Sequence, residues 1–460
     1  EDVLTINGHY AGANGKLKMN TNWDSPGNLS GNNSASDLLT ITGTATGSTS
    51  VIPVAADGRE SVIDGSIGSI ASDLGAITVP VIHVATETGS NPSAFTGTAA
   101  TTGAGELQLK SRLNGDGTRD YFWEITTTNP IFNKGVSGYI QMPQVDLDLG
   151  YASMRTLHER RGENYKATLN TGNTDKSYNQ TWGRVIKDYA KVNGKERFGY
   201  KNHIDGIQVG YDFEIKENYN GDKRFTGAYL SYLRGKADFY DAFNAVNGTV
   251  SGDKFTGSGR AKSYALGVTT TEYKENGTYI DVVGQLSLLR NEYNAIGSQP
   301  LKQDGWGLGM SAEIGRPHIL KEKETHRLVL EPQGQIVFQY LKLDEMNHDN
   351  KFIRQPKQYG LKGRIGARLS YNTYDANQKV KNTVYGVLNI WQHLTSPHTV
   401  IIGQDNLTER YARTVGEIGI GTQLNLSEST YLYGDFRYLH SLGKGSTSGY
   451  QAQIGMKYTF

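Results

Sequence analysis

The chain has 460 residues and balances 47 Lys and Arg against 46 Asp and Glu, and this net charge of +1 argues against general nucleic-acid binding, which needs a basic surface. It has 56 Gly and 28 Tyr but no Cys, and it lacks an apolar run of about 18 residues, so disulfides and transmembrane helices are excluded. Two classes remain: a large soluble β protein, and a transmembrane β-barrel whose alternating strands hide their hydrophobicity from averages along the chain.

Residues 1–128 are rich in Gly, Thr, Ser and Asn, and turn signals such as Asn14-Gly15 and Asp57-Gly58 separate short runs with β-propensity. The runs include Leu4–Ile6, Leu38–Ile41, Val79–Val84 and Tyr121–Ile125. Strands this short bury little surface alone, whereas stacked rungs of a β-solenoid share a continuous core. We therefore predict a β-solenoid for this region, with a β-sandwich as the alternative.

Residues 129–165 are predicted to be a linker that contains a helix from about residue 143 to 162. Pro143 suits the first position of a helix, and Gly162 suits its end. The charged residues of this predicted helix are Asp146, Asp148, Arg155, Glu159, Arg160 and Arg161. Its narrow apolar stripe fits a polar channel better than an oily core, and its length of roughly 27 Å is close to the ~25 Å apolar band of a membrane barrel. A linker helix on the protein surface is the alternative.

Residues 166–460 are predicted to form the barrel, because from about residue 180 onward long alternating strands follow one another between polar loops. Twelve strands are expected to begin near Thr181, Ile204, Arg224, Lys262, Thr278, Gly305, Arg327, Gln358, Asn382, Thr414, Thr430 and Gly449. Twelve is an even number, as single-chain membrane barrels generally have. The fold class is therefore all-β: a transmembrane antiparallel barrel of about twelve strands, with an α-helix threaded through its pore, preceded by a β-solenoid.

Charged and amide side chains occupy one face of several predicted strands, where a dry core would leave them without partners but a wet lumen would not. The lumen candidates are Glu331, Arg364, Arg368, Glu417, Asp435 and Arg437. We expect the helix bases Arg155, Arg160 and Arg161 to meet Glu331, Glu417 or Asp435. We expect the helix acids Asp146, Asp148 and Glu159 to meet Arg364, Arg368 or Arg437. The alternative for each residue is a hydrated lumen group without a specific partner.

The last twelve residues, Gly449–Phe460, alternate between two kinds of side chain. Tyr450, Ala452, Ile454, Met456, Tyr458 and Phe460 share one face, and polar residues and Gly455 share the other. An apolar face bracketed by aromatic residues suits a strand with lipid outside and water inside.

Several separate stretches, in this order, resemble the C-terminal part of a monomeric autotransporter of type V secretion. The stretches are Asn14–Leu17, Ser36–Gly43, Ile77–Phe95 and Tyr121–Ile125 (end of a pertactin-like β-helix passenger), Thr156–Glu163 (end of the linker helix), Trp182–Arg184 (first barrel strand), Leu330–Gln333 (mid-barrel strand), and Gln453, Gly455, Tyr458 and Phe460 (terminal assembly signal). The resemblance implies a translocator of the Gram-negative outer membrane that exports and displays its own N-terminal passenger at the cell surface and then anchors it with the helix plugging the barrel. The alternative is a surface adhesin whose barrel is chiefly an anchor.

The partners that this resemblance implies are outer-membrane lipid, the barrel assembly machinery, periplasmic chaperones, the chain's own passenger as cargo and a host surface receptor. A monomer without nucleic acid, metal or cofactor is expected. The sequence lacks a Gly-x-Ser-x-Gly motif, and His158-Glu159 is followed by Arg160, Arg161 and Gly162 rather than by the second His of a zinc site. We therefore expect no enzyme, and the absence of an Asn pair between residues 129 and 165 favours an uncleaved linker.

Overall fold

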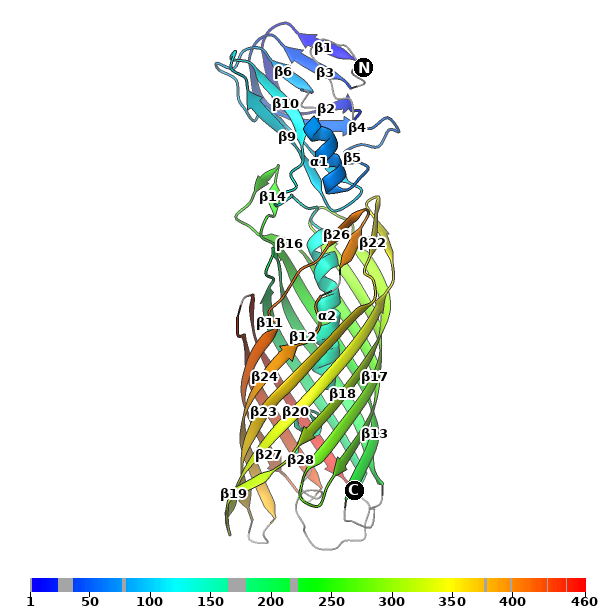
Figure 1. Ribbon diagram of the computed structural model, residues 1–460, viewed down its shortest axis with the longest axis vertical. Helices are drawn as coiled ribbons and strands as arrows, with labels where there is room; N and C mark the ends of the chain where they lie inside the picture. The colour runs from blue at the N-terminus through cyan, green and yellow to red at the C-terminus, as the bar shows by residue number, and fades with distance from the viewer. Residues whose placement is uncertain are drawn as a thin grey trace.

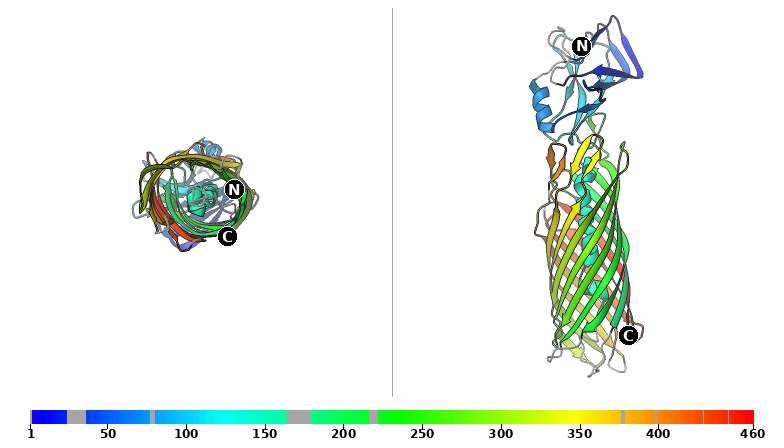
Figure 2. Two further views of the ribbon diagram at one scale, coloured as in Figure 1. Left: turned by 90° about the horizontal axis from the view of Figure 1, so that it is seen from below. Right: turned by 90° about the vertical axis from the view of Figure 1, so that its right-hand side faces the viewer.

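The computed structural model describes residues 2–23, 36–76, 80–163, 179–215, 222–375, 379–397, 399–427, 429–443 and 445–460. The molecule is elongated, with an N-terminal domain (within residues 2–128) standing at one mouth of a long barrel (Figure 1). A helix leads from this domain into the barrel, and the view along the barrel axis shows the ring of strands enclosing it (Figure 2). The C-terminus lies at the opposite mouth.

The N-terminal domain begins with parallel ladders and ends with antiparallel strands. β1 (Val3–Ile6), β3 (Leu38–Ile41) and β6 (Ile82–Val84) pair in parallel, as do β2 (Tyr10–Asn20), β4 (Ala45–Val54) and β7 (Phe95–Thr96), and β5 (Val62–Ile63) with β8 (Thr98–Thr101). β9 (Glu106–Leu113) and β10 (Arg119–Glu124) are antiparallel to their neighbours, and α1 (Ile67–Ala76) lies between β5 and β6 in the chain. Stacked parallel rungs are compatible with a solenoid, which stays a prediction.

Twelve long strands form the barrel, as predicted. They are β11 (Asn179–Asn193), β12 (Phe198–Ile215), β13 (Lys223–Asp241), β16 (Phe255–Tyr273), β17 (Tyr279–Ala295), β18 (Leu301–Gly315), β20 (His326–Leu343), β23 (Gln358–Tyr374), β24 (Val380–His393), β27 (Thr414–Asn425), β28 (Thr430–Ser441) and β29 (Ser446–Thr459). Each pairs antiparallel with the next, and β29 pairs with β11, so the sheet closes. A short additional strand, β19 (His318–Lys323), extends the ladder on β20.

The predicted strand starts were late at β12 and β16, which begin at Phe198 and Phe255 rather than near Ile204 and Lys262. Both strands begin at the mouth next to the N-terminal domain. There they continue beyond the stretch in which apolar residues alternate with polar ones, so the periodicity did not mark their first residues.

The alternation within the strands sorts side chains between two environments. Ile365 and Leu288 point outward and are 68% and 66% exposed, whereas Gln335 and Arg364 point inward and are buried. Large aliphatic side chains this exposed around a closed barrel need lipid against them. Tyr211 and Phe460 contact each other on the outer face, at the mouth where the chain ends.

The predicted single helix from 143 to 162 was wrong in its bounds. α2 runs from Val136 to Met154, and a short α3 runs from Leu157 to Arg161. Pro143 lies inside α2, where its ring removes the hydrogen bond to the carbonyl of Tyr139. The side chain of Gln355, from a loop far along the chain, donates to this carbonyl at 2.6 Å and so replaces the missing bond.

The break between the two helices has its own cap. Thr156 adopts an extended backbone conformation, and its hydroxyl accepts from the Glu159 amide while the Glu159 carboxylate accepts from the Thr156 amide. This reciprocal capping box starts α3 afresh. None of the helices in the described residues is long and apolar enough to cross a membrane.

The loops at the mouth next to the N-terminal domain carry small sheets. β21 (Met346–His348), β22 (Lys351–Arg354), β25 (Val400–Ile402) and β26 (Asp405–Leu407) form a four-stranded sheet, called the loop sheet below. β14 (Ala245–Val246) and β15 (Thr249–Val250) form a hairpin in another loop.

Candidate functional site: the occupied lumen

One side of α2 packs on an apolar wall of the lumen. Val145 and Leu149 are fully buried in a cluster that includes Ile204 of β12, Leu233 of β13 and Ala261 of β16. The lumen is therefore not uniformly polar, because the apolar stripe of the helix meets a matching apolar stripe on the strands.

Neutral donors hold the two aspartates of α2. Asn291 donates to Asp146 at 2.7 Å, and the Tyr200 hydroxyl donates to Asp148 at 2.9 Å. The predicted pairing of these acids with Arg364, Arg368 or Arg437 was wrong. Those arginines lie beside α3, one or more helical turns further along the pore, so they do not reach either aspartate.

The last carbonyl groups of α2 accept hydrogen bonds from side chains of the barrel wall. Arg184 of β11 donates to the carbonyls of Ala152 and Ser153 at 3.3 and 2.9 Å, and Gln208 of β12 donates to that of Ser153 at 3.1 Å. The last carbonyls of a helix have no partner within it and carry partial negative charge, so a guanidinium is well placed there. Arg184 also donates to Gln453 of β29 at 2.7 Å and thereby joins the first strand to the last.

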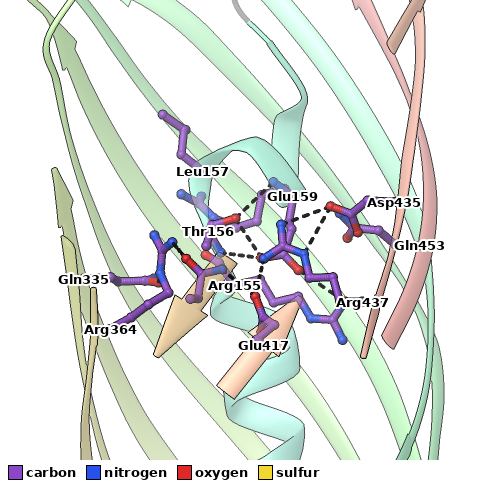
Figure 3. Close-up of polar contacts among 12 residues, drawn as sticks. Arg155, Thr156, Leu157, Glu159, Gln335, Arg364, Glu417, Asp435, Arg437 and Gln453 are labelled. Atoms are coloured by element: carbon purple, nitrogen blue, oxygen red, sulfur yellow. Dashed lines mark hydrogen bonds and ion pairs between the residues drawn. The ribbon is translucent and has the colours of Figure 1, made fainter. Parts of the chain in front are cut away.

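Beyond this point His158 and the charged side chains between Arg155 and Arg161 reach different strands around the ring, an arrangement called the lumen collar below; Figure 3 shows its part around Glu159 and Arg437. Its pairs are Arg155 with Asp188 of β11, His158 with Glu331 of β20 (2.8 Å), Glu159 with Arg437 of β28 (3.3 Å), Arg160 with Asp281 of β17, and Arg161 with Asp212 of β12 (2.8 Å). All ten residues are buried. The five contacts therefore fix α3 from several directions at once.

The wall residues of the collar are also paired with one another. Arg437 contacts Glu417 at 2.8 Å and Asp435 at 3.0 Å, and Arg364 contacts Glu313 at 3.1 Å. Figure 3 shows the carboxylates of Glu159, Glu417 and Asp435 converging on Arg437. Arg368 pairs with Glu163, just after α3. The six lumen candidates thus all lie in or beside the collar.

Of the expected helix-to-wall pairings, the described residues contain one, between Glu159 and Arg437. Arg155, Arg160 and Arg161 were expected to meet Glu331, Glu417 or Asp435, and this was wrong. They meet Asp188, Asp281 and Asp212, because the helix ends before Arg155 and starts afresh at α3, so these side chains point in directions that a continuous helix would not give.

The sequence does indicate that two of these aspartates, Asp212 and Asp281, face the lumen. Asp212 lies between Tyr211 and Phe213, and Asp281 lies between Ile280 and Val282. A lone acid at an inward position of an otherwise apolar alternating strand must face the lumen. His158 and Glu163 are not among the predicted site residues, although they pair with Glu331 and Arg368.

A cavity of about 440 Å³ lies beside α2 in the lumen. Asp148, Tyr200 and Lys362 contribute to its lining. The Lys362 amine lies 3.6 Å from the ring centre of Tyr151 on α2 and 4.4 Å from that of Trp391 on β24. A cation between two aromatic faces is held electrostatically, so this contact ties α2 to the wall opposite its apolar stripe.

The terminal strand divides its four predicted signal residues between two faces. Gln453 and Gly455 point inward, where Gly455 lies against the ring of Tyr433. Tyr458 and Phe460 point outward and are exposed. The inward pair contributes to closing the barrel, and the outward pair faces the membrane side.

The fold and the lumen define a class: an outer-membrane β-barrel whose pore is occupied by the segment that precedes its first strand. Residues 181–437 match the family model described as the autotransporter beta-domain. Because this match covers more than half of the chain, the chain belongs to the autotransporter beta-domain family, and it resides in the Gram-negative outer membrane.

Relatives share this part of the molecule. The adhesin BmaC autotransporter of Brucella suis biovar 1 (strain 1330) is 25% identical over 291 residues, 61% of this chain and 8% of that protein. The serine protease sat autotransporter of Escherichia coli O6:H1 is 29% identical over 162 residues, 34% of this chain and 10% of that protein. The chain thus spans about a tenth of the length of these two relatives.

A solved structure confirms the fold. The transport unit of the autotransporter AIDA-I from Escherichia coli matches with a TM-score of 0.51 and 15% sequence identity, over 71% of this chain and 99% of that one.

Proposed function

We propose that this chain is a translocator that exports its own N-terminal passenger through the outer membrane and then holds it at the cell surface. The observation that carries the proposal is the path of the chain. The N-terminal domain lies at one mouth, α2 and α3 run through the pore, and the barrel strands follow with the C-terminus at the opposite mouth. The simplest route to this arrangement is passage of the N-terminal part through the pore.

The lumen collar supports anchoring after export. Buried ion pairs form only when the geometry is good and the remaining hydrogen-bonding groups have partners. The five collar residues of the chain inside the pore meet partners on five different strands, so this chain segment has one position in which all five are paired at once. We infer that a passenger attached to it stays tethered.

The test replaces residues 2–128 with a foreign polypeptide that folds only after export. Intact cells that expose this polypeptide to an external protease support translocation. If the barrel still resists heat in detergent but the polypeptide remains in the periplasm, the proposal fails.

The second candidate is a surface adhesin, because a relative matched over 61% of the chain is named an adhesin. In that case the N-terminal domain and the loops make the biological contact, to a host surface receptor, and the barrel is chiefly an anchor. A barrel that fails to display the foreign polypeptide, in cells whose wild-type N-terminal domain binds host surfaces, would favour this candidate.

We also propose that the chain itself has no catalytic role and acts as a monomer. Its assembly would involve periplasmic chaperones and the barrel assembly machinery, with Tyr458 and Phe460 as the residues that this machinery contacts. Their exposure on the outer face of the last strand supports that role.

A further inference from the structure

The base of the N-terminal domain is held by a carboxylate from the barrel loops. Asp405 of β26 accepts a hydrogen bond from the amide of Ile67 at 3.0 Å and another from the amide of Ala104 at 2.9 Å. Ile67 is the first residue of α1, and Ala104 lies in the turn between β8 and β9. More than 300 residues of sequence separate Asp405 from each partner, and the Asp405 side chain is almost fully buried.

Asp405 supplies an acidic group at the N-terminus of α1, which the helix's own first turn lacks. The helix has ten residues and no acidic residue in its first turn. A helix of this length is marginal alone in water, and a carboxylate near its N-terminus stabilises it by accepting a free amide and by opposing the helix dipole. The Ser66 hydroxyl accepts from the Ser69 amide at 3.1 Å and caps α1 from within the domain, and the barrel carboxylate adds a second acceptor, so contact with the loop sheet adds stability to α1.

The two surfaces are closely fitted around this contact. A methyl group added at Gly103 would overlap the Asp405 carboxylate, and one added at Gly403 would overlap the carbonyl of Thr102. The Thr101 hydroxyl also accepts from the amides of Gly103 and Gly105, at 3.1 and 3.0 Å. These bonds fix the turn whose Ala104 amide donates to Asp405.

Apolar packing continues across the same boundary. Ile353 and Ile402 of the loop sheet are fully buried. They belong to one cluster with Ile67, Ala104 and Phe132 of the N-terminal domain and linker. The loop sheet is therefore part of the core at the base of the domain rather than a separate mobile loop.

The barrel rim grips the linker next to this base. The Arg197 guanidinium donates to the carbonyl of Pro130 at 2.7 Å, lies 4.0 Å from the ring centre of Phe132 and pairs with Asp241 at 2.7 Å. Asn133, next along, donates to the carbonyl of Gly105 at 2.8 Å. The turn that contains Ala104 is thus held by the linker as well as by Asp405.

We propose that the loop sheet is a docking platform on which the base of the exported domain folds, with Asp405 as the positioning residue. This rests on the proposed function, and it adds that the barrel takes part in folding its passenger after export. The segment that leaves the pore meets a preformed acceptor for two of its amides and an apolar surface for Ile67 and Ala104.

The experiment compares Asp405→Ala with Asp349→Ala in the full chain on intact cells. Asp349 is a matched control, because its carboxylate is exposed in the turn of the same sheet and pairs with His348 at 3.3 Å. Two rates are measured after a pulse of synthesis: the arrival of an N-terminal tag at the surface, and the later gain of protease resistance by the domain.

With Asp405→Ala we expect normal arrival of the tag and a gain of protease resistance slowed at least about tenfold, the factor that even one of its two charge-assisted hydrogen bonds supplies. Asp349→Ala should leave both rates unchanged. If Asp405→Ala leaves the gain of resistance unchanged and only speeds its loss, the contact forms after folding and the platform is refuted. Failure of the wild-type tag to reach the surface would instead refute the proposed function.

A second variant guards against a general assembly defect. Gly103→Ala approaches the same contact from the domain side and should slow the gain of resistance when Asp405 is present. In the Asp405→Ala background, Gly103→Ala should slow the gain of resistance much less, because the carboxylate that the added methyl group overlaps is absent. Strictly additive effects of the two substitutions would contradict the proposal.

Discussion

Replacing Arg160 with Met tests whether the lumen collar holds the plug. Arg160 is completely buried and pairs with Asp281. Removing one partner of a buried pair costs about 3–5 kcal/mol, because the other charge is left without compensation. Asp281 keeps a hydrogen bond from Thr271 at 2.6 Å and the Arg161 guanidinium at 3.7 Å. We therefore expect Arg160→Met to destabilise the bound position of the helices in the pore by about 3 kcal/mol, the lower end of that range.

The assay is hydrogen exchange of the α2 amides in the folded, detergent-solubilised full chain, with the barrel strands as internal reference. A loss of about 3 kcal/mol corresponds to a fall in protection of roughly 100-fold. Arg59→Met is the control, since Arg59 forms only partly exposed pairs in the N-terminal domain and should leave α2 unchanged. Adding Asp281→Asn to Arg160→Met should restore most of the protection, because removing both charges of a buried pair is often nearly neutral. Unchanged exchange in Arg160→Met would refute the reasoning.

Further predictions concern three other parts of the molecule. A hydrogen bond from the Arg119 guanidinium lowers the pKa of Glu87; its stabilising effect is therefore complete above the ordinary value of about 4.3 and is lost as the pH falls through the lower folded pKa. Fluorescence of Trp123 should report this acid transition, and a Glu87→Gln variant that keeps the same pH profile would contradict it. Tyr433→Phe removes a hydrogen bond to the Arg160 carbonyl at 2.5 Å and should lower α2 protection several-fold, about 1 kcal/mol, by hydrogen exchange. Deleting Phe460 should reduce outer-membrane assembly in cells far more than refolding in detergent, and equal losses in both would indicate a purely structural role.

The barrel could be predicted because its information is local. Each strand needs an apolar face for lipid and a polar face for the lumen. Apolar and polar residues must therefore alternate along the strand, and this alternation is visible in the sequence. In β20, Glu331, which was predicted to face the lumen, and Gln335 are buried, whereas Ile336 is exposed.

The passage of α2 through Pro143 could not be predicted, because its cause is distant in sequence. Pro143 normally begins or breaks a helix, and it is tolerated here because Gln355 supplies a donor to Tyr139 from a loop more than 200 residues away. The cap at Thr156 was a local signal, since Thr156 and Glu159 have the spacing of a capping box. The helix break is therefore encoded locally, unlike the passage of α2 through Pro143.

The pairing of charges depends on a further quantity that the sequence does not contain, the rotation and depth of the helix within the pore. Each residue of a helix turns the side-chain direction by about 100° and advances by about 1.5 Å. A shift of one residue along the pore would therefore separate Arg160 from Asp281 and Glu159 from Arg437 together, leaving several buried charges unpaired at once. Because each unpaired buried charge is costly, the collar selects one register of the chain out of all those that pass through the pore. Under the proposed export, a segment that slides through the pore and then stops would gain from charges that are paired in only one position.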